Sequence, residues 1–100
     1  FIKSIGETIG LGTDGEVELI EPFADKTKKE LAKLGKEIGT PLELTWSCYK
    51  GQERPCLTCG TCLERTESFK LAGYPDPALS TLEWEQALQH LKKYTPQERR

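Results

Sequence analysis

All four cysteines of the chain fall in one short segment, CYKGQERPCLTCGTC, which covers residues 48–62. The spacing is C-x7-C-x2-C-x2-C, and the cysteines are Cys48, Cys56, Cys59 and Cys62. Cysteines separated by two residues in a tight turn can direct both sulfurs at one ion, and Gly60 suits such a turn. Gly51 and Pro55 allow the longer gap to fold Cys48 back over the same point. The segment therefore predicts a four-cysteine metal centre.

Three other uses of these cysteines have to be weighed against zinc. Four cysteines allow three disulfide pairings, but nothing in the sequence indicates secretion, and a reducing cytosol disfavours disulfides. A redox C-x-x-C pair usually needs only two cysteines at the start of a helix. An iron–sulfur cluster would suit C-x2-C-x2-C, but the C-x3-C-P continuation of bacterial ferredoxins is absent. Zinc is favoured, and because four thiolates leave no position for water, the zinc is expected to be structural.

The composition explains why such a centre is needed. The chain has 100 residues, of which 36% are hydrophobic and 30% charged. This is enough for one small domain, and so small a core usually requires a metal, disulfides or a larger body to pack against. A structural zinc site can contribute about 10 kcal/mol or more to folding.

Charge and hydropathy exclude two classes of partner. The formal net charge is -2, so no overall positive field is available to hold a nucleic acid. No apolar run approaches the ~20 residues that a membrane-spanning helix needs, and no signal peptide is visible. We therefore expect a cytoplasmic protein without a nucleic-acid or membrane partner.

The segment before the first capping signal predicts a short helix and a strand. Ile2, Ile5 and Ile9 recur at helical spacing, and Gly10 is expected to end the helix. Apolar and acidic residues then alternate over residues 17–20, which is typical of a strand. One strand cannot form a sheet, and the chain begins with Phe1 instead of Met. We therefore expect the last β-α unit of a parallel sheet whose other strands lie upstream in a longer protein.

Two capping boxes mark the starts of further helices. Thr27 with Glu30, and Ser80 with Glu83, have the spacing at which the side chains and backbone amides satisfy each other. The first of these helices is expected to end at Gly39 and the last before Pro96, with another helix over residues 63–72. The expected buried positions are Leu31, Leu34, Ile38, Trp84, Ala87, Leu88 and Leu91.

Two stretches carry a resemblance to known families. PFADKTKKELAKLGKEIGTP resembles a segment of the PP-loop ATP pyrophosphatases, which has Pro, then Asp, then Thr-Lys, and then a helix that ends in Gly-x-Pro. The matching residues are Pro22, Asp25, Thr27, Lys28, Glu30, Leu34, Gly39 and Pro41. LTWSCYKGQERPCLTCGTCLERTESFKLAGYPDP is more specific: TWSCY, C-x-x-C-G-x-C and R-x-E-x-F-x-x-A-G occur in this order in the C-terminal zinc loop of the 7-cyano-7-deazaguanine synthase family.

The resemblance implies an α/β fold class: the C-terminal part of a Rossmann-like PP-loop domain, mostly helical here, with a four-cysteine zinc loop. Residues 1–47 would be the last helix-strand-helix portion of that domain, and residues 48–100 the zinc loop and C-terminal helices. It further implies a homodimeric, ATP-dependent ligase of queuosine biosynthesis, which converts 7-carboxy-7-deazaguanine and ammonia into the 7-cyano product. The Ser-Gly-Gly-x-Asp-Ser loop that cradles ATP in such enzymes is absent from these residues, so the chain alone is expected to be inactive.

Site residues beyond the cysteines are less sharply defined. Asp25 and Lys28 could face the nucleotide, because sites of α/β proteins form where a parallel strand leads into a helix. An equally acceptable interpretation is that Asp25 and Thr27 only cap the helix and Lys28 is solvated. Arg65 and Glu67 are expected to form a surface pair, and His90 is expected to be exposed. No catalytic residue is assigned.

Two other functions stay open at this point. One is another PP-loop tRNA-modifying enzyme, against which TWSCY argues. The other is a zinc module that binds RNA or protein, which would want unopposed basic and aromatic residues around the loop. The nearby cations Lys50, Arg54 and Arg65 are offset by Glu53, Glu64 and Glu67.

Overall fold

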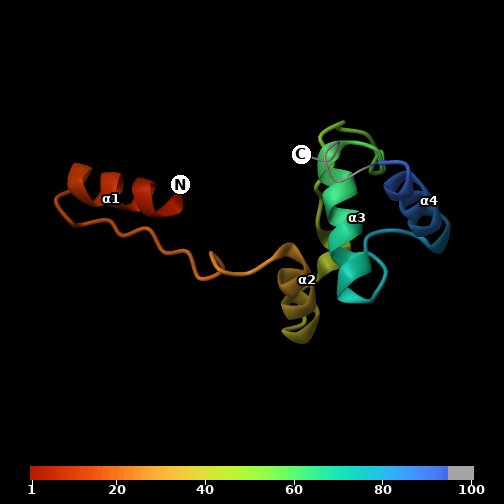
Figure 1. Ribbon diagram of the computed structural model, residues 1–100, viewed down its shortest axis with the longest axis horizontal. Coiled ribbons are helices and arrows are strands. Elements are labelled where there is room, and N and C mark those ends of the chain that lie inside the picture. Colours follow the sequence, from red (N-terminus) through yellow and green to blue (C-terminus); the bar gives the residue numbers. More distant parts are fainter. Residues whose placement is uncertain (95–100) are drawn as a thin grey trace.

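The computed structural model describes residues 1–94, and these form four α-helices and one 3-10 turn (Figure 1). The elements are α1 (Ile2–Gly12), α2 (Lys28–Glu37), η1 (Leu42–Leu44), α3 (Gly60–Ala72) and α4 (Thr81–Lys92). The expected stop at Pro96 lies outside the described residues. Among residues 1–94 no helix combines the length and the apolar character needed to span a membrane.

The molecule has two regions of different character. Residues 1–27, called here the arm, carry α1 and an extended connection that leads away from the other helices (Figure 1). Residues 28–94, called the body, contain α2 and α4, which both pack against α3. Within the described part of the chain, every buried residue lies in the body. The cysteine segment of residues 48–62, called here the metal loop, leads directly into the start of α3, so the body positions the site.

The expected strand at residues 17–20 is wrong for this structure, because no strand occurs within residues 1–94. Val17 and Ile20 are exposed, and Leu19 turns back toward α1, near Gly6. A strand needs backbone partners for its N–H and C=O groups, and no neighbouring strand is present here. The sheet of the predicted Rossmann-like fold is therefore not part of what these residues form.

Helix α2 begins as predicted and ends as predicted. The Thr27 hydroxyl accepts from the Glu30 amide, and the Glu30 carboxylate accepts from the Thr27 amide. After the helix, Gly39 has a φ of 76°, which favours glycine. The buried position, however, is Ala32, while Ile38 is 68% exposed. Ile38 caps the C-terminus beyond the last turn and so leaves the buried face.

Helix α3 begins at Gly60, before the expected start at residue 63. Cys59 is its N-cap, so the last cysteine already lies in the first helical turn. Gly73 ends the helix in the left-handed conformation (φ 92°), and its amide and that of Tyr74 donate to the Phe69 carbonyl. The sequence CGTC therefore joins the metal loop directly to the longest helix.

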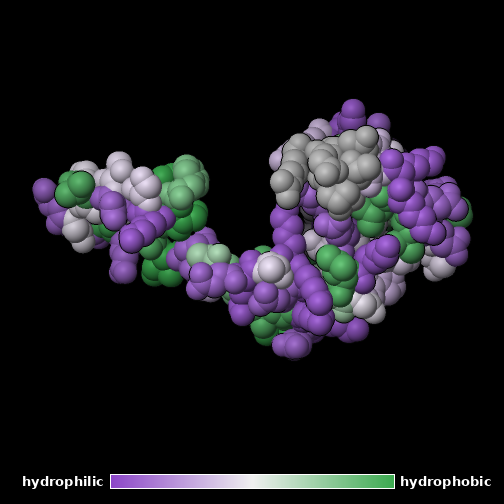
Figure 2. Space-filling model, in the orientation of Figure 1, coloured by the Kyte–Doolittle hydropathy of each residue, from purple (hydrophilic) through white to green (hydrophobic). Residues whose placement is uncertain are grey.

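The core of the body lies between α3 and its two neighbours. Phe69 of α3 is buried and meets Tyr74 edge to face at 5.2 Å between ring centroids. The Tyr74 hydroxyl donates to the Ala32 carbonyl, which ties the end of α3 to α2. Ala87 and Leu91 bury the inner face of α4 as predicted. Figure 2 shows hydrophobic side chains gathered on the arm, where no other element covers them.

Candidate metal centre

The four cysteines converge although they come from different local structures. Cys48 follows η1 and is buried, Cys56 and Cys59 lie in the loop, and Cys62 is buried in the first turn of α3. Their four sulfurs all lie within 4.8 Å of one another. The sequence prediction that these four side chains form one cluster is confirmed, and the cluster could hold a metal ion.

The sulfur geometry fits a tetrahedral ion. Zinc–sulfur bonds of ~2.3 Å place the sulfurs of a tetrahedral site about 3.8 Å apart. The Sγ atoms of Cys56 and Cys62 are 3.9 Å apart, and all four cysteines are free thiols. A disulfide would bring two sulfurs to about 2.05 Å. The arrangement fits a set of metal ligands, and none of the four cysteines forms a disulfide.

Backbone amides donate to the sulfurs. Cys48 Sγ accepts from the amides of Lys50 at 3.4 Å and Cys56 at 3.3 Å. Cys56 Sγ accepts from the amide of Cys59 at 3.3 Å. The turn that aims this last amide requires a φ of 68° at Leu57, an uncommon value for a residue other than glycine, and the Leu57 side chain is buried. These donors stabilise negative charge on sulfur, as a bound thiolate requires.

The acidity of the thiols differs within the cluster. Burial opposes ionisation of Cys59, but hydrogen bonds from the Thr61 hydroxyl and from backbone amides outweigh it and lower its pKa to about 5. Burial also opposes ionisation of Cys56, but the amides of Thr58 and Cys59 outweigh it and lower the Cys56 pKa. Burial and the adjacent Cys59 sulfur raise the pKa of Cys62 above its ordinary range. The cluster thus accepts some negative charge by itself, and a bound cation would favour ionisation of Cys62 as well.

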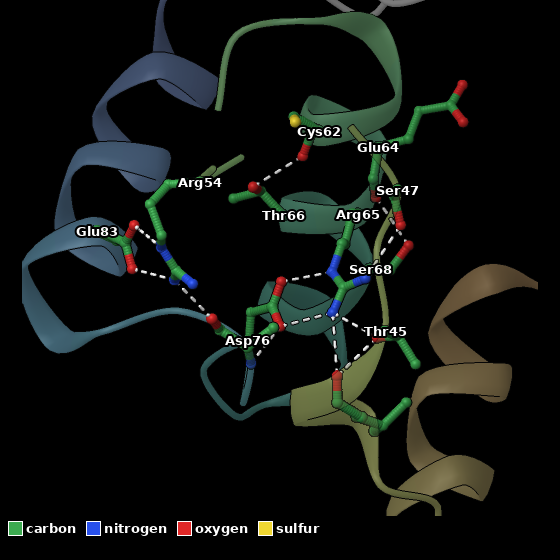
Figure 3. A network of polar contacts seen from close by, with 12 residues as sticks. Thr45, Ser47, Arg54, Cys62, Glu64, Arg65, Thr66, Ser68, Asp76 and Glu83 are labelled. Carbon is green, nitrogen blue, oxygen red and sulfur yellow. Dashed lines mark hydrogen bonds and ion pairs between the residues drawn. The ribbon is translucent and has the colours of Figure 1, made fainter. Parts of the chain in front are cut away.

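A largely buried ion pair lies on the wall of the small cavity that Cys48 and Cys62 also line, and Figure 3 shows it close to Cys62. Arg65 of α3 donates from Nε to Asp76 Oδ2 at 2.6 Å and from Nη2 to Asp76 Oδ1 at 2.9 Å. The prediction that Arg65 forms a surface pair with Glu67 is therefore wrong, because Arg65 pairs with Asp76 instead. The sequence does not reveal Asp76 as the partner, because the turn after α3 has to reverse the chain before the carboxylate reaches the guanidinium.

A second arginine ties the metal loop to α4. Arg54 donates from Nε to Glu83 Oε2 at 2.9 Å and from Nη2 to Glu83 Oε1 at 2.5 Å. Its Nη2 also donates to the Ala78 carbonyl at 2.9 Å. Glu83 is at the same time the capping-box residue of α4. The loop is thus fixed to the start of α4 as well as to α3.

The two predicted nucleotide contacts lie apart from the cysteines along the chain. Lys28, the first residue of α2, forms an ion pair with Glu64 of α3. It lines a groove of about 330 Å³ together with Thr27, Lys29, Glu64, Glu67, Ser68 and Leu71. Asp25 is exposed in the turn before α2 and does not line this groove. His90, expected to be exposed, is half-buried on α4 and is not one of the clustered residues.

Comparison with known proteins identifies relatives of the chain. The family model described as queuosine biosynthesis protein QueC matches residues 1–89. A 7-cyano-7-deazaguanine synthase of Archaeoglobus fulgidus is 49% identical over 89 residues, which are 88% of this chain and 37% of that relative. The synthase of Caldicellulosiruptor saccharolyticus is 41% identical over 88 residues, 86% of this chain and 39% of the relative. That of Brucella ovis is 50% identical over 62 residues, 62% of this chain and 27% of the relative.

No solved structure matches the chain. The chain spans less than two fifths of the length of the first two relatives. The family match nevertheless covers the arm, the metal loop and the first three quarters of α4. Because one family model accounts for residues 1–89, the chain belongs to the QueC family of queuosine biosynthesis proteins.

Proposed function

We propose that this chain is the zinc-bearing part of an enzyme that makes 7-cyano-7-deazaguanine from 7-carboxy-7-deazaguanine, ammonia and ATP. The family match and the names of the relatives support an activity in queuosine biosynthesis. The observation that carries the proposal is the four-cysteine cluster, formed by the residues in which the resemblance to these synthases is most specific. The remaining parts of the reaction machinery would lie in a longer protein.

The proposed reaction begins with a carboxylate, which is a poor electrophile. Transfer of AMP from ATP to the carboxylate oxygen releases pyrophosphate and creates a good leaving group. Ammonia displaces AMP and forms the amide. A second adenylation, on the amide oxygen, then allows AMP and a proton to leave and gives the nitrile. The enzyme is on this basis an ATP-dependent ligase.

The metal we propose is zinc, held by Cys48, Cys56, Cys59 and Cys62. When bound, it would link four points of the loop and neutralise thiolate charge, and four sulfur ligands leave no open position for a water nucleophile. The chain's own contribution is to aim the sulfurs: amides of the loop donate to Cys48 and Cys56, and α3 carries Cys62. The role is therefore structural.

The arm is proposed to complete a Rossmann-like PP-loop domain. Residues 17–20 alternate apolar and acidic side chains and are exposed here without a partner strand, as expected of a strand that lacks its sheet. Residues 1–47 would then belong to the α/β domain and residues 48–100 to the metal loop and the final helices. A homodimer and a cytoplasmic location are further expectations from the family resemblance.

Asp25 and Lys28 are proposed to contact the nucleotide. They flank the N-terminus of α2, where backbone amides and the helix dipole favour phosphate. In the present structure Lys28 is engaged by Glu64 on the rim of the groove between α2 and α3. Nucleotide binding would therefore require Lys28 to exchange that exposed partner for a phosphate, at little cost.

RNA binding by the zinc loop is the less favoured function. Arg54 and Arg65, two cations on which it would depend, each donate to a carboxylate of the same chain. A phosphate backbone would have to displace Glu83 and Asp76.

A chimera tests the proposed function. Residues 1–89 would replace the matching segment of the Archaeoglobus fulgidus synthase, and nitrile formation from 7-carboxy-7-deazaguanine, ammonia and ATP would be measured. We expect an active, zinc-containing chimera. A folded chimera that binds zinc but makes no nitrile would contradict the proposal.

The nucleotide contact is tested in the same chimera by Lys28→Gln, with the neighbouring Lys29→Gln as the matched control. Loss of a phosphate contact should raise the KM for ATP in the first variant and leave it unchanged in the second. Equal KM values for both variants and the parent would remove Lys28 from the site.

A further inference from the structure

A network around the half-buried Arg65 joins the two halves of the cysteine cluster. Asp76 is only 3% exposed, and Arg65 donates to both of its carboxylate oxygens. Asp76 also accepts from the Ala78 amide at 2.9 Å, so its position is fixed by its own turn. A bidentate arginine–carboxylate contact of this kind holds the guanidinium plane in one orientation.

The rest of the guanidinium reaches the segment that carries Cys48. Arg65 Nη1 donates to Ser47 Oγ at 3.0 Å, and Nη2 donates to Thr45 Oγ1 at 2.8 Å. Ser47 directly precedes Cys48, and Arg65 lies in α3, whose first turn contains Cys62. Figure 3 shows these bonds converging on Arg65 from the two sides. Arg65 thus connects the chain positions of the two buried cysteines independently of any metal.

The network is adjacent to the cluster itself. Cys48, Cys62, Arg65 and Asp76 line the same small cavity of about 20 Å³, with Leu57 and Thr66 also on its wall. A space of this size holds no more than a single water. The Thr66 hydroxyl donates to the Cys62 carbonyl at 2.9 Å and closes the helix side of the cavity.

We propose that Arg65, oriented by Asp76, is a positioning residue for the metal centre and controls how fast the metal is lost. It holds the Cys48 segment against α3, so that Cys48 stays within bonding distance when its metal bond opens transiently. Without Arg65 the Cys48 segment can swing away before the bond reforms, and Asp76 is left as an unpaired buried carboxylate. The inference rests on the zinc centre proposed above.

The second arginine supplies a matched control. Arg54 also forms a two-pronged contact with a carboxylate and one bond to a carbonyl, but its side chain is 56% exposed. It holds the middle of the metal loop to α4 and donates neither to the Cys48 segment nor to the first turn of α3. Its removal should therefore leave Cys48 and Cys62 in register.

The experiment measures zinc release from the zinc-loaded chain to a chromogenic chelator in excess. We expect Arg65→Gln to release zinc about 10-fold faster or more, within the range seen when a residue that supports a metal ligand is removed. Arg54→Gln should stay within about twofold of the parent chain. Leu88→Ala, in α4 beside Lys70 and Gly73 at the C-terminal end of α3, controls for general loss of stability.

A second variant separates the link to Cys48 from the ion pair. Thr45→Val with Ser47→Ala removes two acceptors of Arg65 and leaves Asp76 paired, so folding is disturbed less. Loss of these hydrogen bonds should accelerate release about threefold or more. Cobalt(II) in place of zinc should show weaker tetrahedral d–d bands in this variant and in Arg65→Gln, but not in Leu88→Ala.

The outcomes distinguish the two proposals. A parent chain that binds no zinc overturns the metal centre and this inference with it. Zinc-loaded variants at Arg65 and at Thr45 with Ser47 that release metal at the parent rate overturn the inference alone. The same holds if Leu88→Ala, matched for melting temperature, accelerates release as much as Arg65→Gln.

Discussion

The arm and the body both contain amphipathic helical sequence, yet only the body buries it. Helix α1 has a regular isoleucine stripe, but no side chain caps its N-terminus and none of its residues is buried. Helices α2 and α4 each have a complete capping box and at least one buried residue. The difference is what lies opposite: α3 and the metal loop for the body, and only a short extended segment for the arm. Helical periodicity is enough to form a helix, whereas burial requires a second surface.

The arm and the body also differ in how far along the sequence their contacts reach. The body is joined across long sequence distances by the cysteine cluster, the Arg65–Asp76 pair and the hydrogen bond from Tyr74 to Ala32. The bonds of the arm are local, such as that from the Val17 amide to the Thr13 hydroxyl. Isolated helices shorter than about 12–15 residues are marginal in water. The arm should therefore respond weakly to changes that unfold the body.

Metal removal should give the largest difference between the two regions. Stripping bound zinc with a chelator is expected to remove on the order of 10 kcal/mol of apparent stabilisation and to unfold the body. Hydrogen exchange should show loss of protection at Leu63 and Phe69, with little change in α1. Zinc added back should restore it. Persistent protection of these two amides without metal would show that the helices, and not the metal, hold the body together.

Core truncation should sharpen the comparison. Phe69 is buried and contacts the Tyr74 ring, so Phe69→Ala should cost about 3 kcal/mol or more of the free energy of unfolding. Ile9 is half-buried in the arm, so Ile9→Ala should lower the free energy of unfolding by less than about 1 kcal/mol. Denaturant titration of the zinc-loaded chain measures both. Similar losses for the two variants would mean that the arm packs more tightly than its exposure indicates.

The two capping boxes should contribute moderate and similar amounts to the free energy of unfolding, one before α2 and one before α4. Thr27→Ala and Ser80→Ala each remove an acceptor for an N-terminal amide and should cost about 1 kcal/mol. Thr27→Ser and Ser80→Thr keep the acceptor and serve as controls in the same denaturant titrations. If Thr27→Ala were neutral while Ser80→Ala were not, α2 would have to be grouped with the arm.

The smallest effect should come from the exposed Arg54–Glu83 pair. Hydrogen bonds from Arg54, together with the Ser80 amide, lower the pKa of Glu83 to about 2, from an ordinary value of 4.5. A lowered carboxyl pKa stabilises the fold at pH values above 4.5, and this contribution is lost as the pH falls toward 2. The small stability difference between the parent chain and Arg54→Gln should therefore stay constant between about pH 8 and about pH 5.5, as thermal melts can measure. Below pH 4.5 the difference should shrink as the pH falls toward 2, and a difference that stays unchanged there would place the Glu83 pKa close to its ordinary value.

Much of the site could be read from the sequence because it is local. The four cysteines fall within residues 48–62, and a short loop with two C-x2-C steps has few ways to separate them. The sequence points to Arg65 as a charged pair member but predicts the wrong partner. Asp76 reaches Arg65 only after α3 ends at Gly73 and the chain reverses. The pairing of Arg54 with Glu83 has the same origin in the docking of α4 against α3.

The sequence by itself determined which segments are helical, the two capping boxes and the cysteine cluster, because these depend on neighbours within a few turns; α1 ends at Gly12 instead of Gly10, and α3 begins at Gly60 instead of residue 63. Thr27 with Glu30 and Ser80 with Glu83 cap their helices as the spacing predicts. Only the tertiary structure decided the fate of residues 17–20 and the partner of Arg65. A strand exists only when another strand satisfies its backbone groups, and Arg65 pairs with the buried carboxylate that packing brings to it. Both depend on contacts between distant segments, which periodicity and spacing do not encode.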